Sequence, residues 1–239
     1  MTHPRRISIS ISRLGASSVS RLGACVLLLL ALSLESHGQL KLFRMEKDSI
    51  PFFRGFSVSV DLVGPAMLLL SDHGEYAGAL RVNLHDQWFP IVELGVGRAN
   101  HERDEVTGLT YKTTAPYGRI GMDFNILKNK HAKNRLFVGF RYGFTSYKCD
   151  IIRENLPDPV WQSASGFGVK DMACSQHWLE GVLSLDAQIV GPLHLGWSVR
   201  YKRRLFHKEG DIGTTWYVPG FGINDSDNFA ANFNVIIDI

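Results

Sequence analysis

Past its first fifty residues, the chain alternates apolar and polar residues in eight separate runs. The fourth run, 115–125, is typical of them. Its apolar side carries Ile120 and Phe124, and its polar side carries Arg119 and Asp123. Successive side chains of a β-strand point to opposite faces, so each run predicts a strand with one apolar and one polar face. No part of this region keeps a helical period over about 11 residues.

The runs and the segments between them form a second pattern, in which long and short connections alternate. The runs are 54–64, 76–84, 89–98, 115–125, 136–147, 177–188, 193–204 and 229–239. The short connections are 85–88, 126–135 and 189–192, and the long ones are 65–75, 99–114, 148–176 and 205–226. This pattern predicts an all-β fold, an eight-stranded antiparallel up-and-down transmembrane β-barrel with short periplasmic turns and long extracellular loops.

The first 38 residues have the three parts of a secretory signal peptide. Four arginines form a basic start, Ala24–Leu34 is uncharged and apolar, and small residues precede a cut near Gly38. The apolar run is too short for a spanning helix, which needs ~20 residues. We therefore assign 1–38 to a signal peptide, 39–52 to a short periplasmic N-terminal segment and 53–239 to a barrel in the cell outer membrane.

The predicted signal peptide accounts for the positive net charge of the chain. It contains four arginines and one glutamate, which leaves 22 basic and 22 acidic residues in the remainder. Proteins that bind nucleic acids need a basic electrostatic field. The balanced charge therefore argues against a nucleic-acid partner.

Two cysteines, Cys149 and Cys174, remain after the predicted cleavage. An even pair in an exported protein favours a disulfide, with two free thiols as the alternative. Such a bridge would close a loop of about 25 residues and contribute ~3 kcal/mol to stability. It would staple the longest predicted loop, 148–176.

The alternation does not by itself say which face of the barrel points inward. A soluble lipocalin-like carrier of a small apolar ligand would show the same period with an apolar interior. The polar runs carry charges of both signs, which can pair in a narrow lumen, and aromatic residues occur at strand ends, as in membrane-interface girdles. The predicted girdle is Tyr76, Trp88, Phe89, Phe124, Tyr147, Trp178, Tyr201 and Phe229. The predicted lumen network is Asp61, Arg81, Glu93, Arg119, Asp123, Arg141, Glu180, Asp186, Arg200, Lys202 and Asp238.

The run Ala115–Phe124 and the closing run 229–239 carry a resemblance to a known class of protein. The chain resembles the small eight-stranded outer-membrane barrels of Gram-negative bacteria, and more narrowly an uncharacterised barrel family of Bacteroidota. The resemblance covers roughly residues 50–239. It implies a fold and a location, and it brings no catalytic residue, because that family has no established activity.

The remaining candidate sites lie in the loops. Ser175 and His177 share one strand face, but Glu180 has the opposite parity and is not placed to orient the histidine. The segments 101–105 and 224–228 are rich in oxygen ligands, yet neither has the spacing of a 12-residue calcium loop. We therefore predict no catalytic residue, no cofactor and no metal site.

The sequence thus predicts an outer-membrane protein with a structural or binding role and no wide pore. Its expected partners are outer-membrane lipid, the barrel-assembly machinery during biogenesis, and an envelope protein or surface ligand that binds residues 148–176. An outer-membrane enzyme that modifies lipid or lipopolysaccharide is one alternative, and the lipocalin-like carrier is the other.

Overall fold

The computed structural model describes residues 51–104, 107–157, 164–208, 210 and 215–239. The predicted signal peptide and nearly all of the predicted segment 39–52 lie outside the described residues. Within the described part of the chain, no helix is long and apolar enough to cross a membrane.

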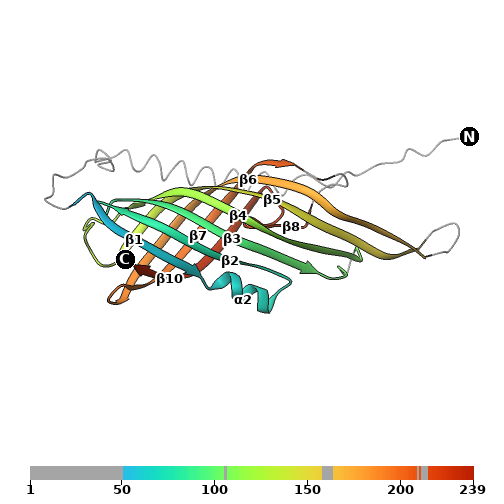
Figure 1. Ribbon diagram of the computed structural model, residues 1–239, viewed down its shortest axis with the longest axis horizontal. Coiled ribbons are helices and arrows are strands. Elements are labelled where there is room, and N and C mark those ends of the chain that lie inside the picture. The colour runs from blue at the N-terminus through green and yellow to red at the C-terminus, as the bar shows by residue number, and fades with distance from the viewer. Residues whose placement is uncertain (1–50, 105–106, 158–163, 209, 211–214) are drawn as a thin grey trace, which may run out of the picture. The chain divides into compact units, whose positions relative to one another are not determined.

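Eight strands close into a barrel in which every neighbouring pair is antiparallel (Figure 1). The strands are β1 (Phe53–Asp61), β2 (His73–Leu84), β3 (Trp88–His101), β4 (Leu109–Asn125), β5 (Arg135–Pro157), β6 (Ala164–Val190), β7 (Leu193–Lys208) and β10 (Asp227–Asp238). Consecutive strands are neighbours, and β10 closes the ring against β1. The predicted all-β fold with eight antiparallel strands is confirmed.

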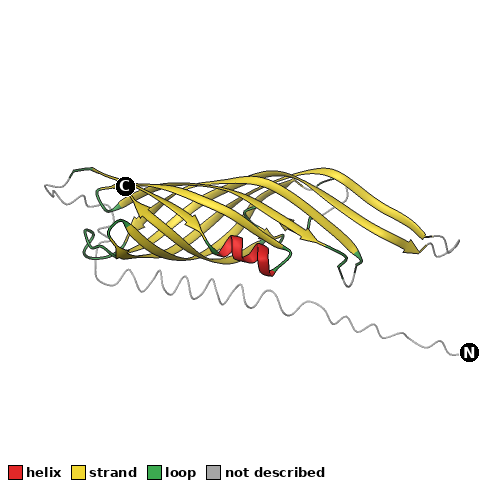
Figure 2. Cartoon of the chain, turned by 60° about the horizontal axis from the view of Figure 1, so that its bottom comes forward, coloured by secondary structure: helices red, strands yellow, loops and turns green. Residues whose placement is uncertain are grey.

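One helix and one small hairpin interrupt connections that the sequence analysis treats as loops. Helix α2 (Val63–Leu70) follows β1 and appears in red beside the barrel wall in Figure 2. The Asp61 carboxylate accepts hydrogen bonds from the amides of Val63 (3.3 Å) and Gly64 (2.8 Å), which satisfies two free donors at the start of α2. Strands β8 (Tyr217–Val218) and β9 (Gly222–Ile223) pair with each other between β7 and β10.

The prediction of a loop over 148–176 is wrong for most of that segment. Strands β5 and β6 continue through it and pair as far as Pro157 and Ala164. Figure 1 shows this two-stranded extension reaching beyond the other strands at one end of the barrel. The pairing register shifts between Cys149 and Ile151 and again between Arg153 and Leu156. Trp161, which the sequence places at the tip, is outside the described residues.

The charged face of the strands points into the barrel and the apolar face points out. Arg119, Asp123 and Glu180 are at most 2% exposed, whereas Leu94 is 66% exposed and Trp197 62% exposed. Further exposed apolar residues around the barrel are Val58, Val60, Leu80, Val92, Ile120, Val138, Phe140, Leu183, Leu185 and Val199. An interior filled by side chains is expected for an eight-stranded barrel.

The predicted aromatic girdle is only partly outside the barrel. Tyr76, Tyr201 and Phe229 are exposed, but Phe89, Tyr147 and Trp178 are buried. Strand parity explains the difference, since Phe89 shares a face with Glu93 on β3, and Trp178 shares a face with Glu180 on β6. These three aromatic residues fill the interior instead of forming a belt.

Candidate functional site in the barrel interior

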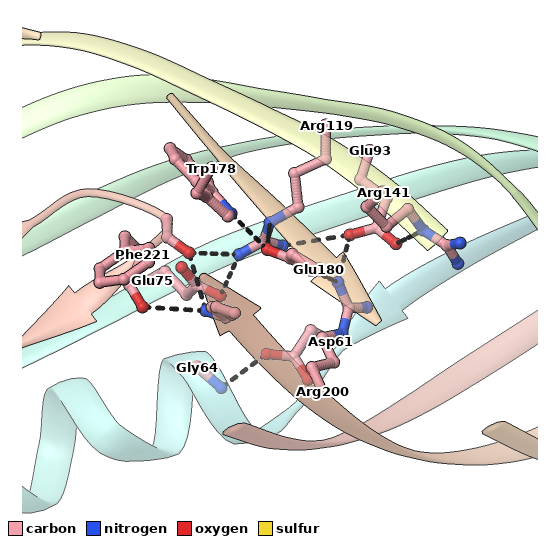
Figure 3. Close-up of polar contacts among 12 residues, drawn as sticks. Asp61, Gly64, Glu75, Glu93, Arg119, Arg141, Trp178, Glu180, Arg200 and Phe221 are labelled. Atoms are coloured by element: carbon pink, nitrogen blue, oxygen red, sulfur yellow. Dashed lines mark hydrogen bonds and ion pairs between the residues drawn. The ribbon is translucent and has the colours of Figure 1, made fainter. Parts of the chain in front are cut away.

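The centre of the interior is organised around Arg119, which β4 places in the lumen. Its guanidinium nitrogens lie 3.1 Å from the Glu93 carboxylate, 3.0 Å from Glu180 and 3.4 Å from Glu75 (Figure 3). It also donates a 2.6 Å hydrogen bond to the carbonyl oxygen of Gly220. A buried charge is costly unless it is paired and hydrogen-bonded, so these acceptors are what holds the guanidinium inside.

A second group lies between β4, β5 and β2. Arg141 donates to both carboxylate oxygens of Asp123, at 2.7 and 2.9 Å, in the two-pronged geometry that fits arginine to a carboxylate. Arg81 lies 3.1 Å from Asp123 Oδ2, which also accepts from Arg141, and 2.6 Å from Asp186. Arg141 also donates a 3.0 Å hydrogen bond to Glu93, which joins this group to the one around Arg119.

Arg200 adds a third connection from the opposite wall. Its guanidinium donates to Glu93 at 2.6 Å and to Glu180 at 3.3 Å. Glu93 thus contacts three arginines. Eight of the eleven predicted lumen residues form one continuous network of ion pairs. They are Arg81, Glu93, Arg119, Asp123, Arg141, Glu180, Asp186 and Arg200.

The other three predicted lumen residues lie apart from this network. Asp61 binds the first amides of α2. Lys202 donates to the carbonyl oxygens of Gly220 (2.8 Å) and Phe221 (3.1 Å). Asp238 lies at the other end of the barrel, 3.0 Å from Arg135 and 3.3 Å from His194.

Several residues that complete the site were not predicted from the sequence. Glu75 and Arg135 lie one residue before the alternating runs 76–84 and 136–147, so the runs do not include them. Trp178 was assigned to the girdle, but its indole nitrogen donates a 2.6 Å hydrogen bond to Glu180. Gly143 on the neighbouring strand makes room for it, because a Cβ there would overlap the indole ring. The alternation of glycine with charged residues on the polar face is the signal that could have indicated an interior packed by large side chains.

The β8–β9 hairpin forms a plug at one end of this network. Val218 and Phe221 are fully buried, and the Tyr217 carbonyl accepts a 2.7 Å hydrogen bond from the Tyr111 hydroxyl. Gly220 at the tip of the hairpin has φ +81°, a left-handed conformation that favours glycine, and a Cβ there would meet the Tyr117 ring. The hairpin carbonyls that accept from Arg119 and Lys202 tie the plug to the charged interior (Figure 3).

Little open space remains between the charged side chains. The cavity lined by Arg81, Glu93, Arg119 and Arg200 has a volume of about 30 Å³. This is room for about two water molecules. The arrangement at this level of the barrel is that of a core filled by paired charged side chains.

Among the described residues the structure has no disulfide, so the predicted bridge between Cys149 and Cys174 is not found. Across the β5–β6 ladder, Cys149 is opposite Met172 and Cys174 is opposite Tyr147, which makes the two cysteines diagonal neighbours. Burial raises the pKa of the Cys149 thiol to about 12. At neutral pH this thiol is protonated and therefore a poor nucleophile.

Ser175 and His177, the pair considered as a catalytic site, lie on the opposite face of β6 from Glu180. Both lie on the outer face of β6, where the His177 ring nitrogen Nδ1 is 2.8 Å from the Tyr142 hydroxyl. Glu180 points into the lumen and binds Trp178 and Arg119. The histidine is thus oriented by a tyrosine instead of a carboxylate.

The two oxygen-rich segments are held by hydrogen bonds to protein groups. His101 lies 2.7 Å from the Asp72 carboxylate and 3.4 Å from Asp104, and its ring stacks on Trp216 with centroids 4.5 Å apart. The hydrogen bond to Asp72 raises the pKa of His101. In the part of the chain that the structure describes, no group of three histidine, cysteine or acidic residues could hold a metal ion.

Comparison with known protein families places the chain in a family. A family model described as "Domain of unknown function (DUF6048)" matches residues 19–238, a range that contains every described strand of the barrel. No curated protein and no solved structure matches the chain. By this match over most of its length, the chain belongs to the DUF6048 family.

Proposed function

We propose that this protein is an outer-membrane β-barrel with a closed lumen and a structural or binding role in the cell envelope. The observation that carries the proposal is the inverted distribution of polarity, with ion pairs inside and exposed apolar side chains outside. Leu94, Phe140 and Trp197 are each more than half exposed. A soluble protein rarely exposes so continuous an apolar surface, whereas lipid is the natural solvent for it.

Strand length and closure support the same proposal. A tilted strand needs ~9–11 residues to cross a bilayer, and each of the eight barrel strands has at least 9 residues. Hydrocarbon cannot satisfy backbone donors and acceptors, and the ring of ladders pairs them except where β10 and β2 extend past β1. The short turns would then face the periplasm and the longer connections the outside.

The filled interior favours a structural or binding role over transport. The charged lumen also disfavours a lipocalin-like carrier, since a carrier of an apolar ligand needs an apolar cavity. The β5–β6 extension, which includes 148–157 and 164–176, is then the surface available to an envelope protein or surface ligand. Outer-membrane lipid and the barrel-assembly machinery are the other proposed partners, and no nucleic-acid partner is proposed.

Fractionation and gel mobility test this proposal together. Cells that express the full chain are separated into soluble and membrane fractions, and the detergent-solubilised protein is run on SDS gels with and without boiling. The expected result is recovery from the outer membrane and a faster unboiled band. Recovery as soluble periplasmic protein, with no change on boiling, would contradict the proposal.

A pair of lysine substitutions tests where the apolar surface lies relative to the middle of the bilayer. A charge near the bilayer midplane of a barrel costs about 2–4 kcal/mol, against about 0–1 kcal/mol near the interface. Leu183→Lys, in the middle of the exposed apolar surface of β6, should reduce the heat-modifiable fraction strongly. Leu205→Lys, near the outer end of β7, is the matched control and should leave that fraction close to wild type.

A further inference from the structure

The barrel wall is incomplete next to α2. The β1–β10 ladder runs from the pair Ser57–Asp238 only to Asp61–Asn234, although β10 begins seven positions earlier, at Asp227. The β1–β2 ladder likewise stops at Val60–Gly78, although β2 begins at His73. Both β10 and β2 therefore continue past the end of β1, and α2 occupies the space that the next residues of β1 would fill. Figure 1 shows the helix at this end of β1.

A cavity of about 360 Å³ lies at this interruption. Its wall includes Val63 and Met67 from α2, Glu75 from β2, and Phe229 and Ala230 from β10. The plug contributes Tyr217, Phe221 and Ile223, and Lys202 reaches the cavity from β7. Ligand pockets commonly have volumes of about 300–1,000 Å³. The cavity is thus large enough for a small ligand or for part of a larger one, and more than ten times the volume of the central cavity.

The two ends of the cavity differ in chemistry. At the open end, Met67 of α2, Ile223 of the plug and Phe229 of β10 are exposed apolar side chains. On the side of the lumen, Asp61 and Lys202 are 4% exposed. Glu75 is also part of the lining, and its carboxylate is 3.4 Å from the Arg119 guanidinium. The close-up in Figure 3 draws Glu75 and Arg119 together. A ligand that fills the cavity must therefore be apolar at one end and charged at the other.

Lys202 is a buried cation with a donor available to a ligand. An ammonium group has three donors, and two of them bind the carbonyl oxygens of Gly220 and Phe221. No carboxylate lies within ion-pair distance of Lys202 among the described residues. A phosphate oxygen could accept from the remaining donor, while the Glu75 carboxylate could accept from an ammonium group.

We propose that the cavity binds one zwitterionic phospholipid from the bilayer, with its head group between Lys202 and Glu75 and an acyl chain against Met67 and Phe229. This inference rests on the proposed membrane location, because only then does the outer end of the cavity open on lipid. The exposed side chains of Leu69 and Leu70 extend the apolar surface of the mouth along α2. An added peptide strand is the competing occupant, since β10 and β2 both extend past the last residue of β1 that pairs with them.

Native mass spectrometry of the detergent-solubilised protein tests the proposal. The protein is mixed with dipalmitoyl phosphatidylethanolamine or with dipalmitoyl glycerol, which has the same chains and no charged head group. The expected result is retention of one phosphatidylethanolamine per chain, with at least tenfold weaker retention of the diacylglycerol. Equal retention of the two lipids, or a retained peptide in place of lipid, would overturn the proposal.

Two variants locate the binding to this cavity. Ala230→Phe fills the cavity from β10, and Met67→Gln makes its exposed mouth polar without altering a buried residue. Each should reduce retention of phosphatidylethanolamine at least tenfold. Ala187→Phe, the matched control on β6, lies away from the cavity and should retain lipid like the wild type. Unchanged retention in Met67→Gln and Ala230→Phe, or equal loss in all three variants, would overturn the proposal.

The same samples separate this inference from the proposed function. Each is also run unboiled and boiled on SDS gels. A heat-modifiable barrel that retains no lipid would overturn the lipid site alone. A protein that stays in solution without detergent and shows no heat shift would overturn both.

Discussion

The wall from β3 to β6 and the seam where β10, β1 and β2 meet are built from the same alternating strands, yet they differ in continuity. The β3–β4 ladder runs unbroken from Trp88–Phe124 to His101–Tyr111. The β1–β10 ladder ends after Asp61–Asn234. The wall supplies Glu93, Arg119, Arg141 and Glu180 to the ion network, whereas the seam is next to the larger cavity. One side of the barrel is therefore a continuous scaffold, and the other leaves access to the interior.

Replacing Arg119, the central arginine, should have the largest effect on stability of all the changes to the continuous wall. Arg119→Ala leaves the Glu93 and Glu180 carboxylates without one of their buried partners, which should lower the free energy of unfolding by about 3–5 kcal/mol. Urea titration of the detergent-solubilised protein measures the change. Arg203→Ala removes an exposed pair with Asp227 and should cost less than ~1 kcal/mol. Equal effects of the two substitutions would contradict the assignment of Arg119 to the centre of the network.

A single added methyl group should disturb the same wall by a smaller amount. Gly143→Ala places a Cβ against the buried Trp178 ring, and overpacking of this kind costs about 1–3 kcal/mol. Gly181→Ala on β6 is the matched control, because a Cβ there would meet nothing within 4 Å. Temperature-dependent loss of the faster unboiled band compares the two. An equal shift in both variants would show that Trp178 does not occupy the space beside Gly143.

Hydrogen exchange should distinguish the seam from the wall directly. Alternate amides of an antiparallel strand point to opposite neighbours, so about half of the amides in 228–232 face the interruption without β1 beside them. They should exchange sooner than the amides of 118–122, which pair with both β3 and β5. Exchange of the protein in detergent, followed by peptide mass analysis, gives the comparison. Equal protection of the two segments would mean that the seam is closed.

The smallest expected effect is a change with pH in the stability of the segment around Trp216, beside the plug. The hydrogen bond to Asp72 raises the pKa of His101, whose ring stacks on Trp216 beside the plug. The stabilisation that protonated His101 gives the folded state is therefore complete below the pKa of ~6.5 in the unfolded state. It is lost as pH rises through the higher pKa of the folded state. Hydrogen exchange of peptides that contain Trp216 should accelerate over that interval beyond the intrinsic rate. The acceleration should disappear in His101→Gln, and its persistence there would exclude His101 as its cause.

Strand parity made most of the barrel predictable. Period-2 alternation does not depend on distant contacts, so the inward direction of Arg119 or Glu180 follows once the polar face is assigned to the lumen. Trp178 was misplaced because the girdle prediction rested on position along the strand, whereas parity with Glu180 puts the indole inside. Eight of the predicted charges meet in one network, but their pairing depends on strand register, which the sequence pattern does not specify.

The end of the barrel that carries α2 and the plug was less predictable, for identifiable reasons. Helix α2 is eight residues long and uncharged, so it lacks both the length and the polar side of an amphipathic period. The β8–β9 plug consists of two-residue strands, which are too short to show an alternation of apolar and polar residues. The cysteine pair suggested a bridge by number alone, whereas the ladder places Cys149 opposite Met172.

The most direct test of the central claim measures what surrounds the apolar face. A spin label is attached to Leu183→Cys in a chain whose three native cysteines are replaced by serine and whose unboiled band is unchanged. In lipid vesicles, the label reports collisions with dissolved oxygen and with a water-soluble nickel chelate. A barrel embedded in the bilayer predicts frequent collisions with oxygen and few with nickel, and the reverse for a label on Arg203→Cys, which is near the outer end of β7. Frequent nickel collisions at both positions would show that the apolar face meets water, and would contradict the account.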